Sequence, residues 1–373
     1  MGEASLLQPE EIRLICKESP LKTIATIVGA RPQFIKCAPV SREIRKHFSE
    51  VLIHTGQHYD YNMSRAFFQE LKIPEPDFNL GIGSGNHGLQ TGKMLIELEN
   101  TLTEIMPDLV VVYGDTNSTL AGALSAAKLQ IPLAHVEAGL RSFNRQMPEE
   151  INRIVADSVA QYLFAPTRTA VNHLHREGFD KQIHLVGDVM YDAFRFNSQI
   201  AEKSAILKQL GAASKSYFLV TVHRPQNTDD PAILKALIGT LEHLNELIIF
   251  PIHPRTRNLM QQYNITVKSP NLHLIEPIGY LDMLKLEKHS KLILTDSGGV
   301  QKEAYFAGVP CLVLRPETEW VELVEHGWAK LIGNDFSRIP EAIEGFKDFQ
   351  CTATDIFGNG QASLKIAEIL KSL

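Results

Sequence analysis

The chain has 373 residues, of which 44% are hydrophobic and 21% are charged, as in ordinary folded globular proteins. This length predicts two domains, each with room for its own hydrophobic core. The net charge of −6 excludes an overall basic surface, so nucleic acid is not an expected partner. No apolar run approaches the roughly 20 residues that a transmembrane helix needs, and we expect no membrane association.

The N-terminal residues lack the basic and apolar regions of a signal peptide, and we expect residues 1–21 to form an N-terminal extension. Four scattered cysteines show no CxxC spacing, which indicates reduced thiols and a cytoplasmic protein. The sequence contains neither HExxH nor zinc-ligand spacing. It therefore predicts no metal and, without a dinucleotide or ATP fingerprint, no cofactor.

Apolar runs alternate with helical patterns through the first half of the chain. The first run, 23–28, ends at Gly29 and is followed by a helical pattern that reaches Lys46. Further runs lie at 51–54, 109–112, 132–136, 162–165 and 183–186. Buried parallel strands read as continuous apolar runs and need a helix between them. We therefore predict a doubly wound, Rossmann-like α/β domain over residues 22–195.

The alternation restarts after a Lys-, Ala- and Leu-rich segment that ends near Ser216. Apolar runs at 217–222, 247–251, 272–275, 292–294 and 310–314 predict a second domain of the same architecture over residues 196–355. Apolar residues at helical spacing predict a last helix within 356–373. Two such domains would place their strand-end loops on a shared cleft, which is a favoured ligand site.

Acidic residues follow two predicted strands of the first domain. Asp115 and Glu137 fall at strand ends, where ligands of open α/β sheets bind. The Asp115 segment is also good turn and helix-cap chemistry. Glu137 is harder to explain structurally, because an acid after a wholly apolar strand is costly to bury without a partner. These acids predict acid–base chemistry but do not identify a reaction.

The second domain contains a candidate phosphate site at 296–303. Its pattern is a strand end, a small-residue turn and a helix start, where free N–H groups and the helix dipole favour an anion. Gly298 and Gly299 would let the backbone approach a ligand closely. Glu303, one turn further on, is placed to bind ribose hydroxyls. An ordinary capped helix remains the alternative.

Other charged and histidine side chains also fall at strand ends. His223 and His253 end strands beside Arg224 and Arg255, and two such histidines favour a functional role over a structural one. Arg31 follows a strand and a glycine turn, where it could reach an anion as a planar fork. A solvated loop charge is the alternative for Arg31.

Eight segments in register resemble the non-hydrolysing UDP-N-acetylglucosamine 2-epimerase family. The resemblance runs from about residue 22 to the C-terminus. It implies two Rossmann-like domains facing a cleft, the GT-B-like fold, with the last helix crossing back to the first domain. It also implies a homodimer. The segments are GARPQFIK (29–36), YGDTNST (113–119), HVEAGLR (135–141), MPEEINR (147–153), VTVHR (220–224), IHPR (252–255), LTDSGGVQKEA (294–304) and TEWVE (318–322).

The resemblance implies an isomerase that interconverts UDP-GlcNAc and UDP-ManNAc by eliminating UDP to a 2-acetamidoglucal and adding it back. Such a reaction needs a carboxylate base and stabilisation of the departing diphosphate. By resemblance, Asp115, Glu137 and Glu149 match catalytic carboxylates, His223 a catalytic histidine and Arg153 an arginine important for activity. We expect Glu137 or Asp115 as a base and His223 as general acid. The predicted substrate-binding residues are Arg31, Lys36, Arg141, Arg224, His253, Ser297, Gly298, Gly299 and Glu303.

Three departures from the family pattern bear on substrate and regulation. Many members have TRPE where this chain has ARPQ, and TERPE where it has TEWVE. The combination of ARPQ and TEWVE is similar to a subgroup that includes UDP-2,3-diacetamido-glucuronate 2-epimerases. That alternative substrate needs another cation, for which Arg141 and Arg145 are candidates. His58 is followed by Tyr59 where substrate-regulated members have arginine, so allosteric activation is not expected. A glycosyltransferase or an inactive sensor would not need the carboxylate set.

Overall fold

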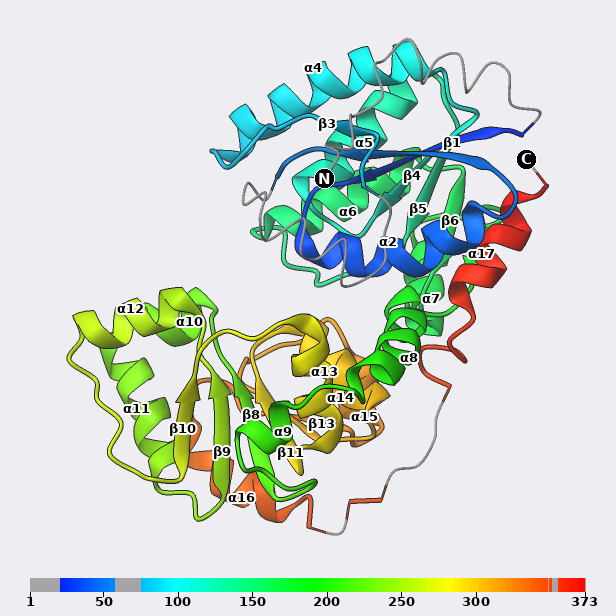
Figure 1. Cartoon of the computed structure of the whole chain (residues 1–373). Coiled ribbons are helices and arrows are strands. Elements are labelled where there is room, and N and C mark those ends of the chain that lie inside the picture. The colour runs from blue at the N-terminus through cyan, green and yellow to red at the C-terminus, as the bar shows by residue number, and fades with distance from the viewer. Residues whose placement is uncertain (1–20, 58–74, 348, 351–354, 373) are drawn as a thin grey trace, which may run out of the picture. The chain divides into compact units, whose positions relative to one another are not determined.

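The computed structural model describes residues 21–57, 75–347, 349–350 and 355–372. The chain divides into two compact units, one of residues 1–193 with 355–373 and one of residues 194–354. Each unit is built around one parallel sheet with helices packed on it (Figure 1). The predicted α/β class with two doubly wound sheets is therefore confirmed.

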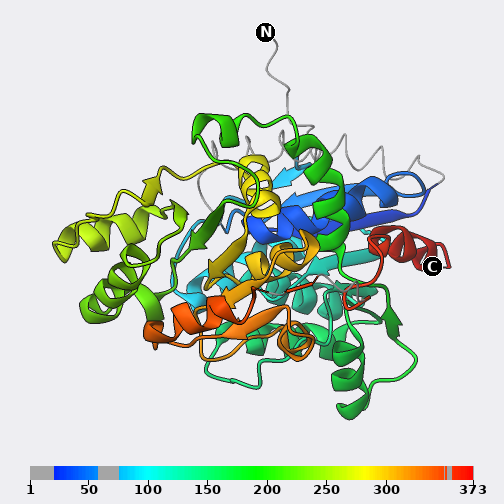
Figure 2. The same ribbon diagram turned by 90° about the horizontal axis from the view of Figure 1, so that it is seen from below.

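The first unit contains seven strands in the order β3-β2-β1-β4-β5-β6-β7, all parallel. Its last segment brings helix α17 against α2 (Figure 1, Figure 2). The elements are β1 (Thr23–Val28), α2 (Arg31–Ile44), β2 (Ser49–His54), β3 (Phe78–Asn79), α4 (His87–Ile105), β4 (Leu109–Tyr113), α5 (Asn117–Lys128), β5 (Leu133–Val136), α6 (Pro148–Val159), β6 (Tyr162–Ala165), α7 (Arg168–Arg176), β7 (Ile183–Leu185), α8 (Val189–Ala201), which runs on into the second unit, and α17 (Ala362–Leu370).

The second unit contains six parallel strands in the order β10-β9-β8-β11-β12-β13. Its elements are α9 (Ile206–Gln209), β8 (Tyr217–Thr221), α10 (Pro225–Thr228), α11 (Pro231–Glu242), β9 (Leu247–Pro251), α12 (Pro254–Gln262), β10 (Leu272–Ile275), α13 (Tyr280–His289), β11 (Leu292–Thr295), α14 (Gly298–Phe306), β12 (Cys311–Val313), α15 (Val321–Glu325), β13 (Ala329–Leu331), η1 (Phe336–Arg338) and α16 (Ile339–Glu344).

The strand order places a switch point in each sheet. In the first unit the order reverses between β1 and β4, and in the second between β8 and β11. Loops after these neighbouring strands leave in opposite directions, so a crevice opens at their carboxyl ends, and ligands of such sheets bind there. The loops that begin at Gly29, Gly114, Val222 and Asp296 therefore occupy the favoured positions.

Small residues let helix α5 pack closely on the first sheet. Strand β4 is fully buried, and the Cβ of a residue at position 122 would lie only 2.9 Å from Ile27 Cδ1 and 3.0 Å from Val112 Cγ1. Gly122 is therefore required for this contact, which sets the start of α5 directly after the loop of Asp115.

None of the helices in the described ranges has the length and apolarity to cross a membrane.

A buried carboxylate on α8 anchors the start of the last helix. Asp192 is 8% exposed and accepts hydrogen bonds from the Ala362 N–H at 3.0 Å, the Ser363 N–H at 2.8 Å and the Ser363 hydroxyl at 2.5 Å. The free N–H groups of a helix N-terminus need such an acceptor. Burial raises the pKa of Asp192 because it penalises the ionised form.

We expect Asp192→Ala to destabilise the first unit by about 2–3 kcal/mol, since it leaves these buried donors unsatisfied. The midpoint of urea unfolding would measure the loss. Asp192→Asn keeps an acceptor oxygen in place and is expected to lose much less. Equal losses in the two variants would contradict the anchoring role.

Candidate active site

A lysine and a glutamate meet above the switch point of the first sheet. Lys36 on α2 donates to a carboxylate oxygen of Glu137, which follows β5, and both residues are at least nine-tenths buried. A Cβ at position 114 would lie 3.0 Å from Lys36 Nζ and 3.2 Å from Glu137 Oε2. Gly114, with φ of +63°, is therefore the residue that leaves room for this ion pair.

Glu137 has an unusual backbone conformation. Its φ is +75°, a value that non-glycine residues adopt only when the surrounding structure holds them there. The N–H groups of Glu137 and Ala138 both donate to the Phe164 carbonyl at 3.1 Å, which fixes the turn after β5. Strain of this kind persists at functional sites, because it places one side chain at the cost of about 1–3 kcal/mol.

Asp115 and Arg153 form a second ion pair at the same edge of the sheet. Arg153 Nη2 lies 2.5 Å from Asp115 Oδ2, and its Nη1 lies 3.0 Å from Glu150 Oε2. Glu150 is 1% exposed and also accepts the N–H groups of Ser142 and Phe143, so it orders the loop before α6. Glu149, one residue earlier, is exposed and free of these structural bonds.

The three predicted catalytic carboxylates therefore lie on loops or helices of one unit. Asp115 is half-buried, Glu137 is buried against a cation, and Glu149 is exposed. Among the described residues, Asp115 and Glu137 have cationic partners and Glu149 has none, and such different environments are how one site separates acid and base roles. This arrangement can support proton transfer to and from a bound ligand.

Arg141 has a structural role that the sequence did not indicate. Its guanidinium is 1% exposed and contacts Asp157 at 2.7 Å and Glu177 at 2.6 Å. These two ion pairs occupy N–H donors of the guanidinium group. The surroundings of Arg141 therefore do not support its predicted use for substrate binding. Arg145, the other candidate cation of this segment, is exposed.

A buried histidine connects this network to the loop of Asp115. His135 on β5 contacts Asp157 through Nδ1 at 2.6 Å and donates from Nε2 to the Gly114 carbonyl at 2.7 Å. Burial raises the pKa of Asp157, but His135 and Arg141 outweigh this effect and lower it overall. Sequence reasoning missed His135 and Asp157, although a histidine inside an apolar strand was a usable signal.

The second unit presents free N–H groups at the start of α14. Ser297 caps this helix by accepting from the Val300 N–H at 3.5 Å. Within the described ranges, the N–H groups of Gly298 and Gly299 have no acceptor. Both glycines are half-buried, so a phosphate could approach them closely. These N–H groups can therefore bind an anion, as the sequence predicts for this turn.

Asp296 organises the neighbouring loop after β8. It is fully buried and accepts the N–H groups of His223 at 3.1 Å and Arg224 at 2.9 Å, as well as the Asn227 side-chain amide at 3.0 Å. His223 Nδ1 lies 3.5 Å from the same carboxylate. Asp296 thus ties the histidine loop to the anion-binding turn across the switch point, a role that the sequence motif did not reveal.

His253 lies beside His223, with 5.7 Å between the ring centroids. Its Nδ1 accepts the Arg255 N–H at 3.2 Å and so caps α12. Desolvation lowers the pKa of His253, and the neighbouring His223 and Arg255 lower it further. Arg255 itself pairs with Asp229 and donates to Thr228 Oγ1 at 3.0 Å.

This lowered pKa predicts a pH dependence of stability. The unfolded chain protonates His253 near pH 6.5, before the folded protein does, so the stability contributed by the neutral ring is lost as pH falls below about 6.5. His253→Asn keeps a capping oxygen but does not titrate. Between pH 7.5 and 5, the melting temperature of the wild type should fall more than that of the variant. Parallel curves would contradict this assignment.

Glu303 is 6% exposed and lies beside a second buried acid. Glu287 on α13 is fully buried and interacts electrostatically with Glu303. Burial, together with the nearby Glu303, raises the pKa of Glu287 well above its usual value. The sequence did not single out Glu287.

Three predictions fall wholly or partly outside the described residues, one of which is the N-terminal extension, where residues 1–20 are not described. The backbone at Arg31 begins α2, but its side chain is outside the description, as are His58 and Tyr59. Among the described residues, no group of three His, Cys, Asp or Glu side chains is arranged to hold a metal ion.

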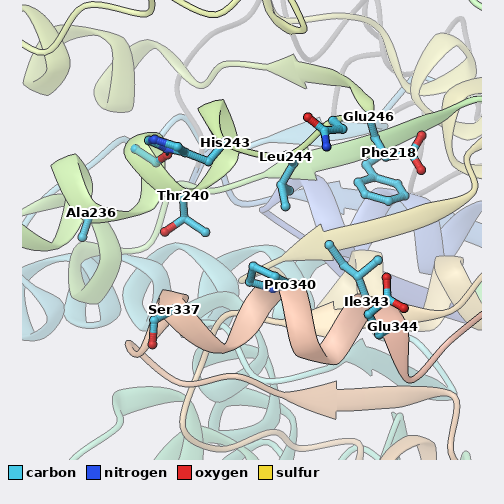
Figure 3. Close-up of a pocket in the computed structure, with 12 residues that line it drawn as sticks. Phe218, Ala236, Thr240, His243, Leu244, Glu246, Ser337, Pro340, Ile343 and Glu344 are labelled. Atoms are coloured by element: carbon cyan, nitrogen blue, oxygen red, sulfur yellow. The ribbon is translucent and has the colours of Figure 1, made fainter.

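The second unit also has a hollow of about 690 Å³ at the opposite edge of its sheet. Figure 3 shows Pro340, Ile343 and Glu344 of α16 on one side and Thr240 and His243 on the other. Phe218 and Glu246 place the hollow at the amino ends of β8 and β9, so it is not part of the site of Ser297 and His223.

Two doubly wound parallel sheets, each with charged groups at its switch point, define an α/β enzyme of the GT-B-like class. A family model described as UDP-N-acetylglucosamine 2-epimerase matches residues 42–371. A UDP-N-acetylglucosamine 2-epimerase homolog of Methanococcus maripaludis is 54% identical over 355 residues, which cover 94% of this chain and 99% of that protein. The chain belongs to the UDP-N-acetylglucosamine 2-epimerase family.

Two further relatives bear on the substrate. The UDP-2,3-diacetamido-2,3-dideoxy-D-glucuronate 2-epimerase of Pseudomonas aeruginosa is 48% identical over 365 residues, with 94% of this chain and 99% of that protein covered. The crystal structure of Methanocaldococcus jannaschii UDP-GlcNAc 2-epimerase in complex with UDP-GlcNAc and UDP matches with a TM-score of 0.86 and 45% identity, over 94% of this chain and 100% of that chain. The predicted family and epimerase class are confirmed.

Proposed function

We propose that this protein is a UDP-N-acetylglucosamine 2-epimerase that interconverts UDP-GlcNAc and UDP-ManNAc. The observation that carries the proposal is the Lys36–Glu137 ion pair, held by a strained backbone at the switch point of the first sheet. The relative crystallised with UDP-GlcNAc and UDP, at 45% identity, supports the same substrate.

The proposed reaction removes the proton from C2 of the sugar and breaks the bond between C1 and the diphosphate oxygen. The electron pair of the C2–H bond forms the C1=C2 double bond of the glucal, and the C–O electrons leave with UDP. Adding UDP to C1 and a proton to the other face of C2 gives the epimer. The step needs a base near C2 and a stabilised leaving group.

We assign the sugar chemistry to the first unit and UDP binding to the second. Glu137 or Asp115 acts as the base, Arg153 holds Asp115, and Glu149 is the further carboxylate for the second face. The N–H groups of Gly298 and Gly299 bind the diphosphate, Glu303 binds the ribose, and His223 is the general acid. Arg224 and His253 add to this anion site, and Arg31 remains a proposed contact.

The alternative substrate is UDP-2,3-diacetamido-2,3-dideoxy-glucuronate. The relative that acts on it is 48% identical, and the exposed Arg145 is a cation suited to the additional carboxylate. We further propose a homodimer in the cytoplasm, as expected from the family resemblance and the reduced cysteines. Light scattering of the purified protein would measure the oligomeric state.

Each UDP-sugar offered alone in D₂O, with the C2 epimer followed by NMR, tests the proposal. We expect UDP-GlcNAc to give UDP-ManNAc with deuterium at C2 and no acceptor present. Conversion of only the uronate would move the assignment to the alternative substrate. A glycosyltransferase would leave both sugars unchanged without an acceptor, and release of free ManNAc would indicate a hydrolysing enzyme.

A further inference from the structure

The segment Thr318–Trp320, which we call the brace, contacts the first turn of α14. The Trp320 indole N–H donates to the Gly298 carbonyl at 3.0 Å. The Thr318 hydroxyl donates to Gln301 Oε1 at 2.6 Å. Glu319 forms two hydrogen bonds with the buried Arg315, at 2.9 and 3.0 Å, which hold the middle of the brace.

The bond to Gly298 adds a second constraint on the peptide that carries a free N–H group, beside the helical hydrogen bonds of α14. In a trans peptide the carbonyl oxygen and the following N–H point in opposite directions within one plane. The described residues contain no cis peptide bonds, so the plane that carries the Gly298 carbonyl also carries the Gly299 N–H. When Trp320 donates to that carbonyl, it therefore helps to fix where the Gly299 N–H points.

Lys302 packs against the face of the Trp320 indole ring. Its Nζ lies 4.2 Å from the Trp320 ring centroid, and both side chains are nearly buried, at 2% and 5% exposure. Burying the charge of Lys302 is costly. The cation–π contact offsets part of that cost and restricts the tilt of the ring.

We propose that Trp320, clamped by Lys302, is a positioning residue for diphosphate binding. Its indole N–H orients the Gly298–Gly299 peptide so that the Gly299 N–H donates to a phosphate oxygen of the UDP moiety. This inference rests on the proposed function.

Trp320→Phe removes the indole N–H but keeps an aromatic face for Lys302. We expect UDP to bind about five- to tenfold more weakly, because one oriented hydrogen bond is lost. Calorimetry would measure the affinity. The matched control is Trp328→Phe. In the described structure Trp328 Nε1 has no hydrogen-bond partner, and the ring packs on Tyr305 at 4.7 Å between centroids. UDP affinity should be unchanged in this control.

Lys302→Met removes the cation–π contact with Trp320 without altering the indole. We expect about two- to fivefold weaker UDP binding, and the double variant with Trp320→Phe should lose less than the product of the single losses. Wild-type UDP affinity in a folded Trp320→Phe would overturn the inference, even if its melting temperature fell. If the wild-type protein neither binds UDP nor epimerises either UDP-sugar, the proposed function itself fails.

Discussion

Glu137→Gln is expected to lower kcat about 10²–10⁴-fold, because the amide cannot accept the C2 proton. The substitution keeps the size of the side chain and an oxygen for Lys36, so the turn after β5 should persist. UDP affinity is expected to stay within a few fold of wild type, since Glu137 is assigned to the sugar. Deuterium incorporation at C2 from D₂O, followed by NMR, measures the proton transfer directly.

The matched control is Glu99→Gln, which neutralises an exposed carboxylate on α4 of the same unit. It should leave both kcat and deuterium incorporation unchanged. If Glu137→Gln retained full deuterium incorporation, Glu137 would not be the base, and Asp115→Asn would become the next variant to measure.

His223→Gln is expected to lower kcat by about 10²–10⁴-fold through loss of the general acid. The loop itself should keep its shape, because Asp296 accepts the backbone N–H groups of residues 223 and 224 rather than the ring alone. The equilibrium ratio of the two UDP-sugars cannot change, because a catalyst alters the forward and reverse rates by the same factor. Coupled assays of UDP-GlcNAc consumption give kcat and KM.

His273→Gln provides the control, because His273 is exposed on β10 and its ring hydrogen-bonds the Pro270 carbonyl, away from the site of His223. Its kcat should equal that of wild type. An unchanged kcat for His223→Gln would remove His223 from the chemistry. A large rise in KM with kcat unchanged would reassign it to substrate binding.

Local sequence patterns predicted eleven of the thirteen strands in the described residues and missed the short strands β3 and β13. The runs at 109–112 and 132–136 correspond to β4 and β5, because a strand buried on both faces must be apolar throughout. The same reasoning located Asp115 and Glu137 at strand ends. The eight family segments added the activity, which residue types alone did not identify.

Partners distant in sequence could not be predicted in this way. Lys36 and Glu137 are 101 residues apart, and only the order of the strands brings α2 beside the end of β5. Arg141 was predicted to bind substrate, but its environment is an ion-pair network with Asp157 and Glu177. A sequence motif specifies which side chains are available and does not specify which neighbours they meet.

By itself, the sequence determined the α/β class, the family and the residues that follow each strand, because periodicity and motif spacing are local properties. The tertiary structure decided the switch points, the positive φ of Glu137, the anchoring by Asp296 and the brace of Trp320 on Gly298. Each of these depends on strands or loops that become neighbours only when the sheet assembles, since hydrogen bonds and ion pairs form between groups close in space.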